Sequence, residues 1–167
     1  DVERLMGGEK ADMVFTDPPY GINLDTDYSG ITARDASMVK GKGIKGKRYA
    51  PVIGDDINFD PSPVLTYFAD VAEIFMWGAD YYANGLPIGG WFVWDKCVTK
   101  DGFVSEGAER MIGSNFELCW SKQKHKREII RLYQRGFCSV DNSDKVHPTQ
   151  KPVQLGEWIF NKFGKVR

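Results

Sequence analysis

A carboxylate, two prolines and an aromatic ring stand together at Asp17 to Tyr20, and a glycine follows them. The prolines fix two consecutive φ angles and carry no N–H, so the carbonyl oxygens beside them lack a competing local donor. The Asp17 carboxylate and the Pro18 carbonyl are therefore two acceptors at a fixed spacing, which suits both hydrogens of an aromatic amino group. The Tyr20 ring could stack on the heterocycle that carries this group. The alternative interpretation is a rigid turn with a capping carboxylate.

A second constrained segment runs from His147 to Pro152, where two X-Pro pairs bracket a turn. Thr149 and Gln150 offer short polar groups, and the N-terminus of a helix that starts after Pro152 would favour a carboxylate. The alternative is a proline-rich start of a helix that binds no ligand. His147 taken alone is more typical of a structural or surface histidine than of a catalyst.

Alternating helices and strands must position these two segments. The apolar spacing predicts a short helix over Val2–Met6, strands over Ala11–Thr16, Glu73–Trp77, Gly90–Lys96, Asn115–Ser121 and Glu128–Tyr133, a helix over Pro61–Ala72, a helical turn over Asp80–Leu86, and a last helix from Pro152 to Phe163. Strands separated by helices predict an α/β fold with an open, mainly parallel sheet covered on both faces. Ligands bind such sheets at the carboxyl ends of the strands, which is where Asp17 stands.

The composition sets limits on size and class. With 167 residues the chain is one domain or a piece of one, and 42% hydrophobic and 13% aromatic residues suffice for a core. A net charge of -1 excludes a protein that is basic throughout. Cys97, Cys119 and Cys138 form no C-x-x-C pair, which fits a reducing cytosol and argues against a zinc site. No apolar run approaches the roughly 20 residues that span a bilayer, so we expect a soluble, cytoplasmic protein without membrane contact.

Residues 17–20 match the pattern Asp/Asn/Ser-Pro-Pro-Tyr/Phe/Trp, and in this the chain resembles the amino-methylating DNA methyltransferases. These enzymes transfer a methyl group from S-adenosylmethionine to adenine N6 or cytosine N4. The segments Trp94–Lys96 and Phe116–Leu118 look like later strands of that family's sheet. The segment His147–Pro152, with Leu155, is similar to the motif that precedes the cofactor half in the beta-ordered subgroup. The resemblance implies a Rossmann-like, S-adenosylmethionine-dependent methyltransferase fold.

The resemblance also implies a mechanism, in which the amino nitrogen of a flipped base attacks the sulfonium methyl. Asp17 and Pro18 would draw the amino hydrogens toward themselves and stabilise the positive charge that develops on nitrogen, while Tyr20 would stack on the base. The residues implied in catalysis are Asp17, Pro18, Pro19 and Tyr20. Those implied in cofactor binding are Asp17, His147, Thr149, Lys151 and Pro152.

A Gly-rich turn follows the His-Pro-Thr motif in that subgroup, and residues 163–167 stand where the strand before this turn would begin. We therefore expect residues 1–167 to form one partial catalytic domain that binds S-adenosylmethionine weakly by itself. The strand Met13–Thr16 would then have an open edge, and open edges pair with other chains. This predicts a homodimer through that edge.

Two basic segments are predicted to contact double-stranded DNA at phosphates beside the flipped base. One is a long loop over residues 23–56, and the other is a target-recognition insertion within residues 122–146. The expected contacts are Arg34, Lys40, Lys42, Lys45, Lys47 and Arg48 in the first, and Lys124, Lys126 and Arg127, in one cluster with Lys122, Arg131 and Arg135, in the second. A solvated face is the alternative for either segment. Residues 41–47 also have the spacing of a nucleotide-phosphate loop, but Arg48 stands where Ser or Thr should bind magnesium, and no apolar strand precedes the segment.

These observations together predict a DNA adenine-N6 methyltransferase encoded by a bacterium or a phage. Asp17 favours adenine, because family members that act on cytosine N4 more often have Ser at this position. A cytosine-N4 methyltransferase is the nearest alternative, and a DNA-binding remnant or partner subunit without catalysis is another.

Overall fold

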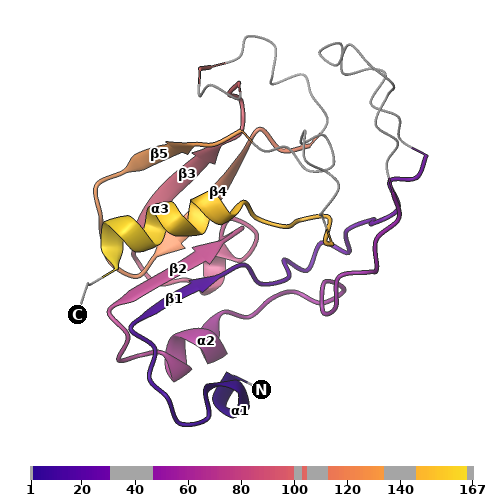
Figure 1. Ribbon diagram of the computed structural model, residues 1–167. Helices are drawn as coiled ribbons and strands as arrows, with labels where there is room; N and C mark the ends of the chain where they lie inside the picture. Colours follow the sequence, from indigo (N-terminus) through magenta and orange to yellow (C-terminus); the bar gives the residue numbers. More distant parts are fainter. Residues whose placement is uncertain (1, 31–46, 100–102, 105–112, 134–145, 165–167) are drawn as a thin grey trace.

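The computed structural model describes residues 2–30, 47–99, 103–104, 113–133 and 146–164 (Figure 1). The elements are α1 (Val2–Met6), β1 (Met13–Thr16), α2 (Ser62–Tyr67), β2 (Glu73–Trp77), the 3-10 turn η2 (Ala83–Gly85), β3 (Gly90–Asp95), β4 (Phe116–Ser121), β5 (Glu128–Arg131) and α3 (Val153–Phe163). Every predicted helix and strand is present, most within two residues of its predicted bounds. The chain is therefore of the α/β class, as the hydrophobic spacing predicted.

The five strands form one mixed sheet in the order β1-β2-β4-β3-β5. β1 runs parallel to β2 and β3 runs parallel to β5, but β4 lies between β2 and β3 and is antiparallel to both. Four of the five strands therefore run in one direction and β4 is reversed, so the prediction of a mainly parallel sheet is confirmed only in part. A parallel neighbour needs a crossover connection, usually a helix. The described residues between β3 and β4 contain only an isolated bridge, Val98 to Val104, and the chain returns beside β3 in the opposite direction.

Both faces of the sheet are covered, as predicted. The side chains of β2 alternate between them, since successive residues of a strand point to opposite faces. Phe75 and Trp77 pack with Leu155 and Ile159 of α3, and α3 crosses the sheet in Figure 1. On the other face, Ile74 and Met76 of β2 pack with residues of α2 and its surroundings. One apolar layer on each side of the sheet thus holds the strands in place.

The second helix is shorter than the predicted span of residues 61–72. α2 ends at Tyr67. Two carbonyls beyond it, those of Ala69 and Val71, accept hydrogen bonds from Lys122 Nζ at 2.5 and 2.7 Å. The side chain of Lys122 thus satisfies backbone acceptors that follow the helix and fixes the turn into β2. This lysine, expected among the DNA contacts, has a structural role.

The strand β1 lies at one edge of the sheet, and no described strand pairs with its outer side. This agrees with the expected open edge. Pairing with a second chain through it stays a prediction. No helix in the described part of the chain combines the length and the apolar character needed to cross a membrane.

Candidate active site

A cavity of about 550 Å³ lies where β1, β2 and β3 end and β4 begins. Its lining includes residues 17–20 after β1, Gly78 after β2, Lys96 after β3, Phe116 to Leu118 at the start of β4, and residues 146–151 before α3. The two motifs singled out in the sequence therefore share one cavity. Its position at the carboxyl ends of β1, β2 and β3 is the one predicted.

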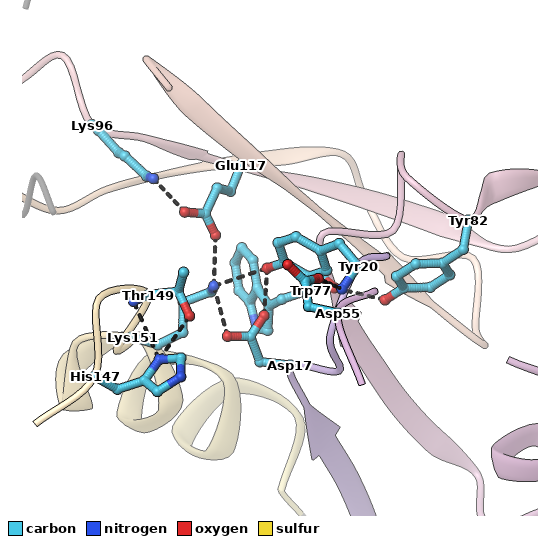
Figure 2. Close-up of polar contacts among 10 residues, drawn as sticks. All are labelled: Asp17, Tyr20, Asp55, Trp77, Tyr82, Lys96, Glu117, His147, Thr149 and Lys151. Carbon is cyan, nitrogen blue, oxygen red and sulfur yellow. Dashed lines mark hydrogen bonds and ion pairs between the residues drawn. The ribbon is translucent and has the colours of Figure 1, made fainter. Parts of the chain in front are cut away.

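The two motifs meet in a direct ion pair between Asp17 and Lys151 (Figure 2). Lys151 Nζ lies 2.8 Å from Asp17 Oδ2 and 3.0 Å from the Tyr20 hydroxyl oxygen. The Tyr20 hydroxyl in turn donates to Asp17 Oδ1 at 2.5 Å. Burial, followed by the charges of Asp17 and Glu117, raises the pKa of Tyr20 far above its ordinary value, so this hydroxyl keeps its proton and acts as a donor. Both carboxylate oxygens of Asp17 are thus oriented by neighbours.

Lys151 makes a second ion pair, with Glu117 of β4. Its Nζ lies 2.9 Å from Glu117 Oε2, and the other oxygen of Glu117 is paired with Lys96. Burial would lower the pKa of Lys151, but the carboxylates of Glu117 and Asp17 raise it above the ordinary lysine value. Burial would likewise raise the pKa of Glu117, yet Lys151 and Lys96 hold it below its usual value. Lys151 and Glu117 are therefore both charged near neutral pH.

Sequence reasoning did not select Glu117 or Lys96 as site residues. Glu117 stands inside the apolar run of β4, and Lys96 follows the apolar run of β3. A charged residue inside or directly after an apolar strand is the signal that could have found them. The register pairs Asp95 with Phe116, so the end of β3 and the start of β4 lie side by side.

A buried carboxylate, Asp55, fixes the chain that leaves the cavity after Tyr20. Its Oδ1 accepts the backbone N–H groups of Tyr20 and Gly21, each at 2.9 Å, and its Oδ2 accepts that of Leu24 at 2.8 Å. Burial would raise the pKa of Asp55, but these bonds to the charged form hold it below its ordinary value. Its partners are about 30 to 35 residues away in sequence, so local spacing gave no sign of this role.

Gly21 is required by the same turn. It has a φ of +75°, and a Cβ at this position would lie 2.6 Å from the carbonyl oxygen of Ile57. Only glycine combines this backbone conformation with this close approach. The turn after Tyr20 is therefore determined by Gly21 and Asp55 together.

The Tyr20 ring, predicted to stack on a base, is stacked on Tyr81. The two rings are nearly parallel, at 9°, with centroids 4.9 Å apart. Tyr81 follows β2 at the rim of the cavity and is 51% exposed. Gly78 makes room for the pair, since a Cβ there would lie 2.0 Å from the Tyr20 ring. The site therefore contains a stacked pair of aromatic rings where the sequence indicated the Tyr20 ring alone.

The segment before α3 forms a tight turn organised by His147. Its Nδ1 lies 3.0 Å from the Thr149 hydroxyl and accepts the Thr149 N–H at 3.3 Å, and its carbonyl accepts the N–H of Gln150. Pro152 is buried at the start of α3 and does not line the cavity. Of the residues implied in cofactor binding, Asp17, His147, Thr149 and Lys151 thus line the cavity. His147 also shapes the turn, and Pro152 starts the helix.

Part of the first basic segment lies beside the cavity. Arg34, Lys40, Lys42 and Lys45 are outside the described residues. Lys47 and Arg48 are exposed, and Arg48 lies 3.8 Å from Asp27. The cavity is lined by Tyr28, which precedes Lys47 and Arg48 in the described chain, and by Val52, which follows them. The first basic segment therefore starts and ends near the site.

The first part of the second basic segment, residues 122–127, is in a different place. Ser121 at the end of β4 pairs with Gly90, the first residue of β3, so Lys124, Lys126 and Arg127 follow at the amino ends of β2 and β3. Strands of 5 and 6 residues, such as β2 and β3, are about 15–20 Å long at about 3.3 Å per residue, so these three residues lie about that far from the cavity. The expectation that these three residues flank the site is wrong, because β4 is reversed and carries them to the opposite end of the sheet.

Comparison of the chain with models of protein families, with curated proteins and with solved structures found no match in any of the three. Among the described residues, no group of three or more His, Cys, Asp and Glu side chains is placed to hold a metal ion. Among the described residues, Cys97 and Cys119 are not disulfide-bonded, and Cys138 lies outside the described residues.

Proposed function

We propose that this chain provides the target-base site of a DNA amino-methyltransferase that acts on adenine N6. One observation carries the proposal. Asp17 and Lys151, which belong to the two motifs of the resemblance and are 134 residues apart in sequence, form an ion pair of 2.8 Å in one cavity. An ion pair between motifs so far apart in sequence is expected if both belong to one catalytic site. It is not expected of two unrelated turns.

Asp17 would act as an acceptor for the amino group. A carboxylate has about four lone-pair positions, and Tyr20 and Lys151 use one on each oxygen of Asp17. Free positions remain for a hydrogen of the amino group, and the Pro18 carbonyl would take the other hydrogen. Two acceptors that are held in place before the reaction stabilise positive charge on the nitrogen without first having to reorganise. This activates a nitrogen whose lone pair is otherwise spread into the ring.

The cofactor that the resemblance implies is S-adenosylmethionine, and the residues of the cavity fit its methionine end. The Lys151 ammonium and the Thr149 hydroxyl match a carboxylate, and Asp17 matches a cationic group. The volume of about 550 Å³ is in the range of 300–1,000 Å³ that is usual for small-molecule sites. When bound, S-adenosylmethionine supplies the methyl group. Lys151 and Thr149 would hold its carboxylate at the edge of the cavity formed by the turn before α3.

Two further features support the proposal. The described ends of the first basic segment lie beside the cavity, where DNA phosphates would have to be held if a base is to enter it. A sheet covered by helices on both faces, with its cavity at the strand ends, is also the arrangement expected of a Rossmann-like methyltransferase domain.

The test is transfer of a radioactive methyl group from S-adenosylmethionine to DNA, followed by analysis of the methylated base. It uses this chain and a version extended through the cofactor half that the resemblance implies. We expect N6-methyladenine as the product, and loss of transfer in Asp17→Ala with little change in duplex affinity. Asp70→Ala, at an exposed aspartate away from the cavity, is the control. Methylated cytosine would favour the N4 alternative, and DNA binding without transfer by any form would favour the non-catalytic one.

A further inference from the structure

A line of alternating charges connects β3 to the end of β1 through the middle of the candidate site. Lys96 is paired with Glu117, Glu117 with Lys151 at 2.9 Å, and Lys151 with Asp17 at 2.8 Å. Figure 2 shows these groups in this spatial order, and Lys151 also contacts the Tyr20 hydroxyl. Two cations and two anions alternate, so the line as a whole is neutral.

Lys151 is held by charge as well as by hydrogen bonds. Its ammonium donates to Asp17 and to the Tyr20 hydroxyl and forms an ion pair with Glu117 Oε2. The side chain of Lys151 is only 9% exposed and that of Glu117 only 20%. Because water has little access, losing the Glu117 carboxylate would leave the buried ammonium with less compensating negative charge, which is costly. Glu117 thus supplies a contact that is difficult to replace.

The charge of Glu117 matters as much as its position. Positive charge develops on the amino nitrogen during the proposed reaction, close to the Asp17 carboxylate. Lys151 lies against the same carboxylate, and its charge alone would oppose that development, since like charges at short range repel. Glu117 offsets the charge of Lys151 from the side away from Asp17. Lys151 can then orient Asp17 without cancelling its effect on the nitrogen.

We propose that Glu117 is a positioning residue, which holds the Lys151 ammonium on the Asp17 carboxylate and thereby orients the acceptor for the amino group. The inference rests on the proposed function. Lys96 acts one step further away, by pairing with the other oxygen of Glu117 and fixing its carboxylate plane. The sequence motifs include Asp17 and Lys151 but not Glu117, which comes from the reversed strand β4.

The experiment compares Glu117→Gln with Glu128→Gln. Glu128 is also a strand glutamate paired with a lysine, Lys162 of α3, but it lies at the opposite end of the sheet. The first readout is the pKa of Lys151, followed through the NMR resonance of its Cε or Nζ in the 167-residue chain. We expect this pKa to fall in Glu117→Gln and to stay unchanged in Glu128→Gln. Glu117→Asp keeps the charge and should retain most of the wild-type value.

Glu117→Gln leaves two cations and one anion, and it could fail to fold for that reason alone. The double variant Lys96→Gln with Glu117→Gln removes one charge of each sign and keeps the line neutral. We expect it to fold and to show the same fall in the pKa of Lys151. The Tyr20 hydroxyl proton is a second signature, since its resonance should move when Asp17 is no longer held.

The kinetic measurement is methyl transfer from S-adenosylmethionine to DNA. It is made with the 167-residue chain or with the extended version, whichever is active. We expect kcat to fall by about 10- to 100-fold in Glu117→Gln, as for a displacement of about 1 Å at a reacting group, with KM for DNA nearly unchanged. An unchanged pKa of Lys151, or a lowered pKa with full kcat, would overturn the proposal. A wild-type protein that transfers no methyl group would refute the proposed function instead, while the two resonances would still decide whether Glu117 holds Lys151 on Asp17.

Discussion

The rings of Tyr20 and Tyr81 lie nearly parallel with their centroids 4.9 Å apart. This is the distance of an offset stack, so one face of Tyr20 is already occupied by the ring of Tyr81. A base that enters the cavity must then separate the two rings or stack on the exposed side of Tyr81. In both cases Tyr81 becomes part of the surface that receives the base.

Replacing Tyr81 should therefore weaken the binding of an unpaired base. We expect Tyr81→Ala to reduce affinity by about 1–3 kcal/mol, the usual contribution of one stacked aromatic ring. Tyr81→Phe should keep it, because the ring and not the hydroxyl makes the stack. The measurement is the fluorescence of 2-aminopurine in a single-stranded oligonucleotide titrated with protein. Equal or tighter binding by Tyr81→Ala would show instead that Tyr81 only shields Tyr20.

Gly78 should be intolerant of a side chain. It has a φ of +65°, and a Cβ would lie 2.0 Å from the Tyr20 ring, so that Gly78→Ala forces the ring to move. We expect a loss of about 1–3 kcal/mol of stability from overpacking, in addition to the cost of the left-handed backbone. Gly8→Ala is the matched control, because Gly8 has a φ of +87° but no atom within 4 Å of the added Cβ. Thermal unfolding of both variants should show the larger loss for Gly78→Ala, and equal losses would argue against a tight fit of Tyr20.

Asp55 should make stability depend on acid pH. Its pKa is lowered in the folded chain by backbone N–H donors, so the unfolded chain binds a proton more readily. The stabilisation is present above the unfolded value of about 3.9 and is lost as pH falls through the lower folded value. We expect wild type to lose more thermal stability between about pH 4 and pH 2 than Asp55→Asn. Asp70→Asn should keep the wild-type pH dependence, and a similar slope for all three proteins would contradict this role.

Features encoded locally were predicted well from the sequence. The apolar run of residues 73–77 became β2 with the same bounds, and Pro152 stands at the start of α3. The direction of β4 was not predictable, because residues 96–115 contain no pattern that distinguishes a crossover from a return beside β3. Since β4 carries Glu117 to the site and Lys124 away from it, this one reversal explains both a missed site residue and a wrongly placed one.

The predicted homodimer depends on the outer edge of β1. Its backbone groups have no partner strand among the described residues, and an edge of this kind can pair with another chain. We expect the sedimentation coefficient to rise with protein concentration as dimers form. A coefficient that stays at the monomer value at high concentration would contradict the prediction.

The described basic residues of the two segments should affect DNA binding differently, because Lys47 and Arg48 lie beside the cavity while Lys124, Lys126 and Arg127 lie at the other end of the sheet. Each lysine or arginine that contacts a phosphate contributes about 0.9 to the slope of log affinity against log salt. Neutralising Lys47 and Arg48, which lie beside the cavity, should reduce this slope and the affinity. Neutralising Lys124, Lys126 and Arg127 removes three charges but should leave the slope unchanged, since a duplex held at the cavity does not extend to the amino ends of β2 and β3 unless it bends around the domain. Binding isotherms at several salt concentrations give both slopes. A larger decrease from the second set would mean that DNA lies on the other end of the sheet, and a base could then not reach Asp17.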